Sequence, residues 1–510
     1  MTNAECRMTS RAQRDRLPQA ARREAKRIND RRVLAFVILL SSLVIPARAA
    51  PPGLENVFPA GGQAGQRVDI TVAGKDLEKT SPQAWCSEPK IAVLAGDKPK
   101  KFVLGIGSDV LPGPYLLRLF TNDGVTPPRI IEVGKLPEQL EKEPNDAFAD
   151  VKSVEPAMNV TFNGVLEKAG DVDGFALRVQ KGKVVTLELH GYALGSPMDP
   201  AMRLLSDRGV EIAGGHDTHN LDPRIQHTPT ADGVLFVQVF AFAHPPAADV
   251  ALKGSANHVY RLTVTDGPAK APPADEAKAL TIPASINGCI AKSREEDAYT
   301  FTAKKGDDLQ FTLRAQALRS PLDATLRIED ADGKVLQQAD DGEKENLDPA
   351  LRWKAPKDGS FKLVVADRFH QGSADHAYEL AVKPFAPSLS GTLDTHAYVL
   401  AAGKTVEVKL NVKTSGTFSG KIQAKATQLP AGVTADPVDV PAKGGDVKLT
   451  LKAAPEAAVS QAPFAVEIVT SAPDAVQTVL ASYAIPFTEP RGDLLITSDT
   501  HPWLTVTAKK

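Results

Sequence analysis

The 510-residue chain has few cysteines and few aromatic residues. It contains three cysteines, of which Cys86 and Cys289 lie beyond the N-terminal segment and in different parts of the chain. A scaffold held by disulfides needs several closely spaced pairs, so we expect two buried free thiols instead. Aromatic residues make up 5% of the chain, with three tryptophans in three different segments. Recognition of polysaccharide or collagen needs flat aromatic surfaces, so the composition disfavours a dedicated carbohydrate-binding module.

The chain also lacks the short motifs of common catalytic sites. We find no Gly-x-Ser-x-Gly, His-Glu-x-x-His, Cys-x-x-Cys or glycine-rich phosphate loop. Ser196 with a remote histidine is a conceivable nucleophile, but its Ser-Pro phrase recurs at Ser320 and therefore indicates a structural corner. The Arg-Gly-Asp tripeptide at 491–493 matches an adhesion motif too short to be specific. The sequence predicts a protein that is not an enzyme.

Histidines are few, and two of them stand close together in "HDTHN" at 216–220. His216 and His219 beside Asp217 are conceivable zinc ligands. No helix would bring their nitrogens together, however, and the matching loop of the repeat described below reads "DDGEKEN". We therefore expect an exposed loop. Tyr192, Phe240 and Phe242 are candidates for an aromatic face, although we expect them in the protein core.

No apolar run is long enough for a typical membrane span. The longest, "VLAFVILLSSLVIP" at 33–46, is shorter than the roughly 20 residues that cross a bilayer. It follows an arginine-rich stretch and precedes "ARA" at 47–49, which together predict a secretory signal peptide cleaved after Ala49. A retained anchor, a twin-arginine signal at Arg31-Arg32 and a start at Met8 remain alternatives. We expect secretion, a periplasmic location or attachment at a bacterial cell surface.

Net positive charge is absent. The whole chain has a formal charge of −2, and residues 1–49 hold 11 of its 60 basic and 4 of its 62 acidic residues, which leaves a mature charge near −9. An acidic exported protein is a poor partner for nucleic acid or anionic membrane and a reasonable one for divalent cations.

A long internal repeat is present. "ALGSPMDP" at 193–200 returns as "ALRSPLDA" at 317–324, and further landmarks recur in register between residues 141–266 (the first copy) and 280–384 (the second copy). They are the phrases "FNG" and "ING", a shared Asp, "KG", "NLDP", "DG", and "VYRLTV" against "AYELAV". Such self-similarity indicates tandem duplication of one domain.

Short alternating runs predict strands throughout the chain. In the first copy they are "FALRV", "VVTLEL", "AMRLL", "VLFVQVF" and "VYRLTV", separated by Gly, Pro, Asn and Asp. No segment shows a sustained helical stripe. We predict an all-β string of β-sandwich domains. The expected segments are a signal peptide at 1–49 and domains at 52–135, 136–267, 268–385 and 386–510.

These landmarks resemble the bacterial pre-peptidase C-terminal domain. The resemblance rests on "EKEPNDAFADV" (141–151), "NGVLEKAGDVDGFALRVQKG" (163–182), the repeated corner phrase, "NLDP" and "YRLTV". It implies jelly-roll-like sandwiches that serve secreted hydrolases or extracellular proteins as non-catalytic modules. "FPAGGQAGQRVDITVAG" is similar to the IPT/TIG immunoglobulin-like fold, and the last domain looks immunoglobulin-like. This order of modules resembles exported planctomycete proteins.

The strongest chemical candidate is a calcium site in the first copy. Calcium prefers six to eight hard oxygen ligands, and clustered acids with an Asn carbonyl supply them. In clostridial collagen-binding relatives, a similar acidic segment and a later acidic loop hold calcium. The resemblance implies the ligands Glu141, Glu143, Asn145, Asp146 and Asp171, and Asp173 as a further candidate. The repetition of Asp173 as Asp297 favours a structural role in a turn for this residue. The alternative is a solvated acidic linker. The second copy lacks this pattern.

The sequence thus predicts an exported, non-catalytic protein for adhesion, spacing or scaffolding, with calcium stiffening its first copy. The expected partners are a cell-envelope protein or polysaccharide. The alternative function is an accessory or targeting subunit for a secreted peptidase or glycan hydrolase. Neither reading includes nucleic acid or a membrane span after signal cleavage.

Overall fold

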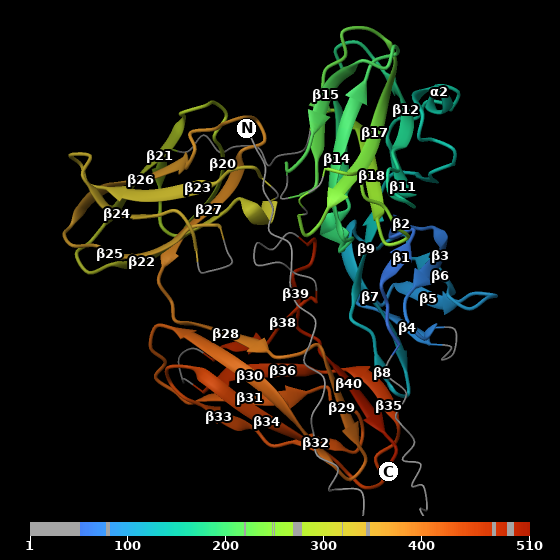
Figure 1. Cartoon of the computed structure of the whole chain (residues 1–510). Helices are drawn as coiled ribbons and strands as arrows, with labels where there is room; N and C mark the ends of the chain where they lie inside the picture. Colours follow the sequence, from blue (N-terminus) through green and yellow to red (C-terminus); the bar gives the residue numbers. More distant parts are fainter. Residues whose placement is uncertain are drawn as a thin grey trace, which may run out of the picture. The chain divides into compact units, whose positions relative to one another are not determined.

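The chain is a string of β-sandwich domains, as the strand pattern predicted (Figure 1). The computed structural model describes residues 52–77, 82–218, 221–246, 248, 250–268, 278–318, 320–342, 347–471, 476–486 and 494–509. The expected signal peptide, His219 and the Arg-Gly-Asp tripeptide lie outside these ranges. Within them no helix is long and apolar enough to span a membrane.

The N-terminal sandwich consists of two sheets whose strand orders are β1-β3-β6-β5 and β2-β9-β7-β4, with β8 paired to β7. Its core is aliphatic, and Ile70, Leu104 and Ile131 are fully buried between the sheets. Its strands are β1 (Asn56–Phe58), β2 (Gly61–Gln63), β3 (Arg67–Ala73), β4 (Gln83–Cys86), β5 (Ile91–Ala95), β6 (Lys101–Ile106), β7 (Gly113–Thr121), β8 (Gly124–Val125) and β9 (Arg129–Gly134).

The first copy has sheets ordered β10-β11-β18-β13-β16 and β12-β17-β14-β15. A short helix, α2 (Phe148–Val151), lies against the outer side of the second sheet. The other elements are β10 (Glu138–Leu140), β11 (Val160–Val165), β12 (Asp173–Val179), β13 (Val185–His190), the 3-10 helix η1 (Tyr192–Leu194), β14 (Met198–Leu205), β15 (Glu211–Gly215), β16 (Arg224–His227), β17 (Gly233–Ala243) and β18 (Val259–Asp266).

The second copy repeats this topology. Its sheets run β20-β27-β22-β25 and β19-β21-β26-β23-β24, so every strand after the leading one corresponds to a strand of the first copy. Its elements are β19 (Ala279–Leu280), β20 (Ala284–Cys289), β21 (Glu296–Ala303), β22 (Asp308–Arg314), η2 (Gln316–Leu318), β23 (Ala324–Glu329), β24 (Val335–Ala339), β25 (Ala350–Lys354), β26 (Gly359–Asp367) and β27 (Ala377–Pro384).

The leading strands differ between the copies. β10 runs parallel to β11, at the edge of the sheet that contains β18. β19 instead runs parallel to β21, in the opposite sheet of the second copy. The segment that enters each sandwich therefore takes a different route, and this difference decides which acidic residues can meet.

The C-terminal domain contains sheets ordered β28-β30-β34-β32, β33-β31-β36-β37, β29-β40-β35 and β38-β39. Along β30 every second side chain is buried, as expected for a strand with one face on the core. The strands are β28 (Ser388–Leu393), β29 (Ala397–Ala401), β30 (Thr405–Ser415), β31 (Ile422–Thr427), β32 (Val433–Ala435), β33 (Val438–Val440), β34 (Gly445–Ala453), β35 (Ser460–Pro463), β36 (Ala465–Thr470), β37 (Thr478–Leu480), β38 (Tyr483–Ala484), β39 (Ser498–Asp499) and β40 (Trp503–Thr507).

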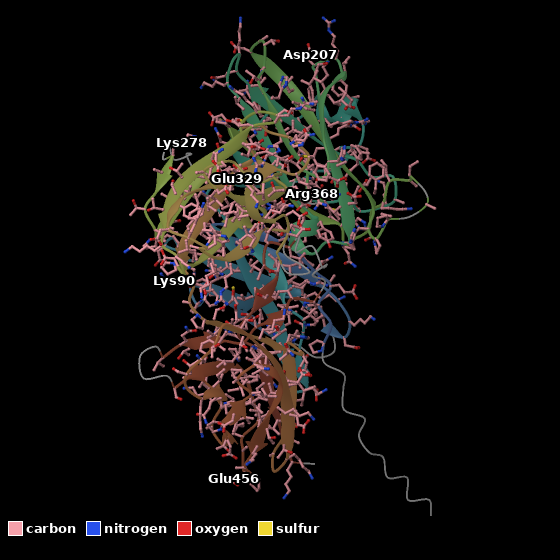
Figure 2. All side chains as sticks on the ribbon, turned by 90° about the vertical axis from the view of Figure 1, so that its left-hand side faces the viewer. Lys90, Asp207, Lys278, Glu329, Arg368 and Glu456 are labelled. Atoms are coloured by element: carbon pink, nitrogen blue, oxygen red, sulfur yellow. The ribbon has the colours of Figure 1, made fainter. Side chains whose placement is uncertain are left out.

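Two of the charged side chains labelled in Figure 2 lie in turns between strands. Lys90, between β4 and β5, and Asp207, between β14 and β15, are both exposed. Cys86 and Cys289 are free thiols, as expected, but only Cys86 is buried; Cys289 is partly exposed. Burial raises the pKa of the Cys86 thiol to about 11, so this thiol is a poor nucleophile at neutral pH.

The repeated "FNG" and "ING" phrases have a packing explanation. Gly164 lies opposite Tyr260 in the β11–β18 pair, and Gly288 lies opposite Tyr378 in β20–β27. A Cβ atom at Gly164 would lie 2.2 Å from the ring of Tyr260, and one at Gly288 would lie 2.1 Å from Tyr378. Each glycine therefore makes room for a buried tyrosine ring.

The "NLDP" phrase holds the short 3-10 helix of each copy. The Asp222 carboxylate accepts hydrogen bonds from the backbone N–H groups of three successive residues, 191–193. Asp348 accepts two such bonds from residues 315 and 316. Ser196 Oγ donates to the Val259 carbonyl at 2.5 Å. These contacts give the repeated phrases an architectural role.

Two details of the prediction are wrong. The corner phrase ends earlier than expected, because β14 already begins at Met198 and Asp199 lies inside the strand. Phe240 and Phe242 were expected in the core, but they are partly exposed on the outer side of β17, since the core side is taken by the buried alternate residues Val237, Val239 and Ala241. Tyr192 is buried as expected.

The glycine–tyrosine packing can be tested in the second copy, because Trp353 is buried there and reports its unfolding by fluorescence. Gly288→Ala should lower the free energy of unfolding by about 1–3 kcal/mol in urea denaturation, the usual cost of overpacking. Adding Tyr378→Leu should remove most of the clash, so the two changes should be strongly non-additive. A change below about 0.5 kcal/mol for Gly288→Ala alone would contradict the packing argument.

Candidate metal centre

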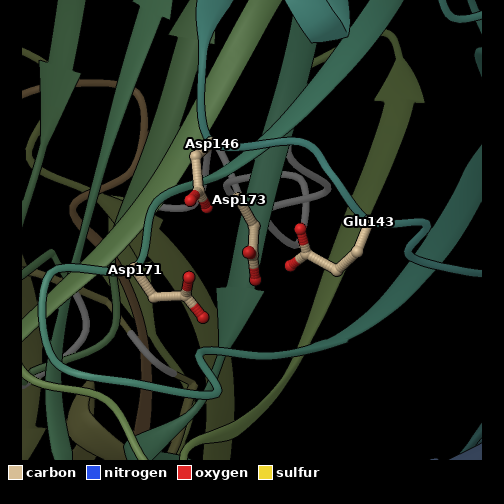
Figure 3. Close-up of side chains that lie close together, drawn as sticks. All are labelled: Glu143, Asp146, Asp171 and Asp173. Carbon is tan, nitrogen blue, oxygen red and sulfur yellow. The ribbon is translucent and has the colours of Figure 1, made fainter.

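Four carboxylates converge in the first copy: Glu143, Asp146, Asp171 and Asp173. Their ligand atoms all lie within 4.8 Å of one another, and Figure 3 shows the four groups facing a common space. Among the described residues this is the one such group of His, Cys, Asp and Glu side chains.

The carboxylates come from two segments. Glu143 and Asp146 lie between β10 and α2, whereas Asp171 precedes β12 and Asp173 begins it. Glu143 also accepts a hydrogen bond from the Asn145 N–H at 3.1 Å, and this contact forms a local turn in the first segment. The site thus joins the segment that enters the sandwich to the loop between two core strands.

Asp173 connects the two sheets of the sandwich. It is fully buried, and its Oδ2 accepts a hydrogen bond of 2.6 Å from the hydroxyl of Tyr260 on β18. Asp297 and Tyr378 form the same contact in the second copy, at 2.7 Å. The repetition of Asp173 therefore reflects a contact between sheets. The turn role expected for this residue is wrong, because it stands in a strand.

Glu141 lies behind the group of four. Its Oε1 accepts a hydrogen bond from the Val165 N–H at 2.7 Å, and the Tyr260 hydroxyl lies 3.2 Å from its Oε2. Burial raises the pKa of Glu141, and burial with the hydrogen-bonded Glu141 carboxyl raises the pKa of Asp173 to about 10. Burial and the neighbouring Glu141 carboxyl group thus both favour the protonated form of Asp173.

Several buried polar atoms at the site have no hydrogen-bond partner. Asn145 is 2% exposed, yet neither its Oδ1 nor its Nδ2 is hydrogen-bonded. The Oδ1 atom of Asp173 is also unsatisfied, and Oδ1 of Asp171 has only the Lys168 ammonium group 3.2 Å away. Buried polar atoms are normally paired, because an unpaired one costs about 1–3 kcal/mol. Unsatisfied oxygens inside a group of carboxylates fit a cation.

Gly174 lets the first segment approach the sheet. A Cβ atom there would lie 2.2 Å from Cγ2 of Val151 and 2.9 Å from the backbone oxygen of Asn145. The second copy has Ala298 at the corresponding place in β21. A sandwich with this alanine has no room for a segment packed as residues 145–151 are. The exchange of Gly for Ala is visible in the sequence, but the segment that it makes room for is not.

The second copy fills the equivalent place differently. Tyr299 stands where the first copy has Phe175, and its hydroxyl is 2.7 Å from the hydroxyl of Tyr378. A phenol therefore supplies the hydrogen bond that Glu141 supplies in the first copy. The Tyr378 hydroxyl is therefore hydrogen-bonded to Asp297 and to Tyr299, and it needs no second carboxyl group.

The repeat includes a further motif, "GSANHVY" at 254–260 and "GSADHAY" at 372–378. In each copy the Ser hydroxyl and the His Nδ1 are 2.8–2.9 Å apart, and burial lowers the pKa of His258 and His376. The Ser O atoms also accept local backbone hydrogen bonds. These pairs stabilise the turn before β18 and β27.

Of the conceivable zinc ligands, the structure describes His216 and Asp217, and no metal-ligating group forms around them among the described residues. His216 is exposed, and its Nδ1 lies 3.3 Å from the neighbouring Asp217 carboxylate. Its surroundings fit the exposed loop expected from the sequence.

Comparison with known proteins gives limited similarity. No family model matches the chain. Over 78 residues it is 36% identical to a probable subtilase-type serine protease of Deinococcus radiodurans, which is 15% of this chain and about a tenth (10%) of that protein's length.

Two solved structures align with low scores. A mutant alpha-2-macroglobulin of Salmonella covers 85% of this chain and 30% of its own, at 12% identity and a TM-score of 0.16. The M60 catalytic domain with two CBM51 domains from Clostridium perfringens covers 89% and 39%, at 9% identity and 0.17. Scores this low carry no argument about function.

The raised pKa of Asp173 predicts how metal-free stability depends on pH. In the unfolded chain this carboxyl ionises near pH 4, but in the folded chain it stays protonated up to about pH 10. Its contribution is therefore fully present below pH 4 and is lost progressively as pH rises toward 10. In the presence of chelator, the melting temperature of the first copy, measured by calorimetry, should fall between pH 5 and pH 8. The Asp173→Asn variant should show a smaller fall over the same range. An unchanged slope in the variant would contradict the assignment.

Proposed function

We propose that this chain is an exported, non-catalytic string of β-sandwiches for adhesion, spacing or scaffolding in the periplasm or at the cell surface. In this proposal the first copy binds one calcium ion. The observation that carries the calcium proposal is the convergence of four carboxylates beside the buried, unsatisfied Asn145.

Calcium suits the donor set better than other common metals. The available atoms are carboxylate and amide oxygens from Glu143, Asn145, Asp146, Asp171 and Asp173, and no thiol or imidazole is among them. Hard oxygen donors in an irregular arrangement match calcium, whereas zinc prefers nitrogen and sulfur and magnesium demands a near-ideal octahedron. Glu141 would not contact the ion directly but would help to position Asp173 through their shared neighbour Tyr260.

Calcium would stiffen the start of the first copy. The segment with Glu143 and Asp146 enters the sandwich from β10, a three-residue edge strand, and an ion shared with Asp171 would tie it to the β11–β12 loop. An ion that binds only the folded chain stabilises it by about 2.7 kcal/mol at a concentration of 100 Kd. In a string of domains, a fixed entry segment limits motion between neighbours.

The accessory role remains the second candidate. The observation that favours it is the 78-residue similarity to a probable subtilase-type serine protease. A shared non-catalytic module would explain such a short match. In that case the chain would present or target a separately encoded secreted hydrolase.

Calcium binding can be measured by titration calorimetry on the chain from Ala50, after treatment with EDTA. We expect one ion per chain and a melting temperature that rises with calcium and falls again with chelator. Asp171→Asn should weaken binding at least tenfold, because it removes a charged ligand. Glu295→Gln is the matched control: Asp171 and Glu295 both accept a backbone N–H in the same loop of their copies, so only the first change should affect calcium. Absence of heat and of a melting shift would remove the calcium proposal.

The two functional candidates differ in what the chain binds. As a scaffold, the chain from Ala50 should co-sediment with isolated cell-envelope material, and more strongly with calcium than with EDTA. As an accessory, it should instead co-purify with secreted peptidase or glycan hydrolase activity. Turnover of peptide or glycan libraries by the purified chain alone would contradict both.

A further inference from the structure

One cationic side chain lies against the acidic group. The Nζ atom of Lys168 is 3.2 Å from Oδ1 of Asp171 and 3.5 Å from Oδ2 of Asp146. These two carboxylates come from the two different segments that build the site. The ammonium group thus joins the same parts of the chain that a bound ion would join.

The backbone of Lys168 is held firmly although its side chain is not. The Asp171 N–H donates to the Lys168 carbonyl, and the Gly170 N–H donates to the Leu252 carbonyl. A Cβ atom at Gly254 would lie 2.1 Å from the same Lys168 oxygen, so the "GSANH" turn packs directly on this loop. The starting point of the side chain is therefore fixed beside the acids.

The side chain itself is 64% exposed. Exposed ion pairs contribute little, with a median near 0–1 kcal/mol, because water screens the charges and ordering a long side chain costs entropy. Lys168 can thus leave the carboxylates at small cost. A divalent cation held by several oxygens at once is a much stronger partner for the same groups.

The second copy supplies a natural comparison. Lys292 occupies the corresponding loop position, and Gly372 packs against its carbonyl as Gly254 does against that of Lys168. Lys292 is exposed, and the group of four acids has no counterpart around it in the described part of the second copy. A lysine is therefore present in both loops, but it faces converging carboxylates in one copy.

We propose that the Lys168 ammonium is a built-in counter-ion of the calcium site. It neutralises the carboxylates of the calcium-free protein, holds the two segments together, and moves into solvent when calcium binds. Lys168 therefore weakens calcium binding and limits the disorder of the empty site. This inference rests on the proposed calcium site.

The size of the effect follows from electrostatics. A unit charge and a divalent ion about 4 Å apart repel substantially even at solvent-like dielectric, but the mobile lysine avoids much of this cost. We expect removal of the charge to tighten calcium binding by about fivefold to tenfold. Because the groups are exposed, the difference should shrink in high salt.

The test uses the chain from Ala50 with Lys168→Met and the control Lys292→Met, each stripped of metal and titrated with calcium chloride in a calorimeter. Lys168→Met should lower the Kd for calcium about fivefold to tenfold at a low concentration of potassium chloride. The decrease should be smaller at a high concentration, about 0.5 M, because salt screens the charges. Lys292→Met should leave the Kd unchanged. In EDTA, Lys168→Met should melt at a lower temperature than the unmodified chain, and in saturating calcium the order should reverse.

The outcomes separate the inference from the function on which it rests. If the unmodified chain binds calcium and Lys168→Met binds no more tightly than Lys292→Met, the counter-ion role is wrong and the calcium site stands. If none of the three proteins binds calcium, both proposals fall. Equal tightening by both substitutions would indicate a general charge effect and would also overturn the role of Lys168.

Discussion

A hydrogen bond between an aspartate and a buried tyrosine organises both copies. Asp173, which is buried, and Asp297, which is half-buried, lie at the start of strands in one sheet, and Tyr260 and Tyr378 lie in the opposite sheet, so each pair fastens the two sheets together. The tyrosine rings need a glycine opposite them. A buried carboxyl group in turn needs further polar partners, since an unpaired one is costly. The chemistry of the first copy follows from that need.

The two copies meet this need in different ways. In the second, the hydroxyl of Tyr299 completes the hydrogen bonding of Tyr378, and no second carboxyl group joins that of Asp297. In the first, Phe175 leaves that place empty of polar atoms, and Glu141 enters from the preceding segment. With Glu141 come the neighbouring acids at 143 and 146. Duplication thus preserved the frame, while a few side chains determined whether the site became a hydrogen-bonded core or a group of carboxylates.

This difference changes what each sandwich contributes to the string. The hydrogen-bonded network of the second copy holds a single carboxyl group, and among the described residues no converging acids offer a site for a cation there. A carboxylate group placed between an entry segment and a core loop adds stability that depends on a cation, on salt and on pH. Such a dependence suits a protein that we propose works outside the cytoplasm and binds calcium there. The repeated Ser-Pro, Asn-Leu-Asp-Pro and Gly-Ser-Ala phrases belong to the frame.

The sequence by itself determined the strands, the duplication and the shared topology, because two-residue alternation and turn residues are local, and the spacing of repeated phrases needs no third dimension. It also located the acidic residues. Only the tertiary structure decided that four of them meet, that Glu141 and Asp173 share Tyr260, and that Phe240 and Phe242 point outward. Alternation separates the two faces of a strand, but it does not show which face meets the other sheet. The contacts that bring the acidic segments together depend on the route of β10 and on the space beside Gly174. Both features are properties of the packed sheets and not of the local sequence.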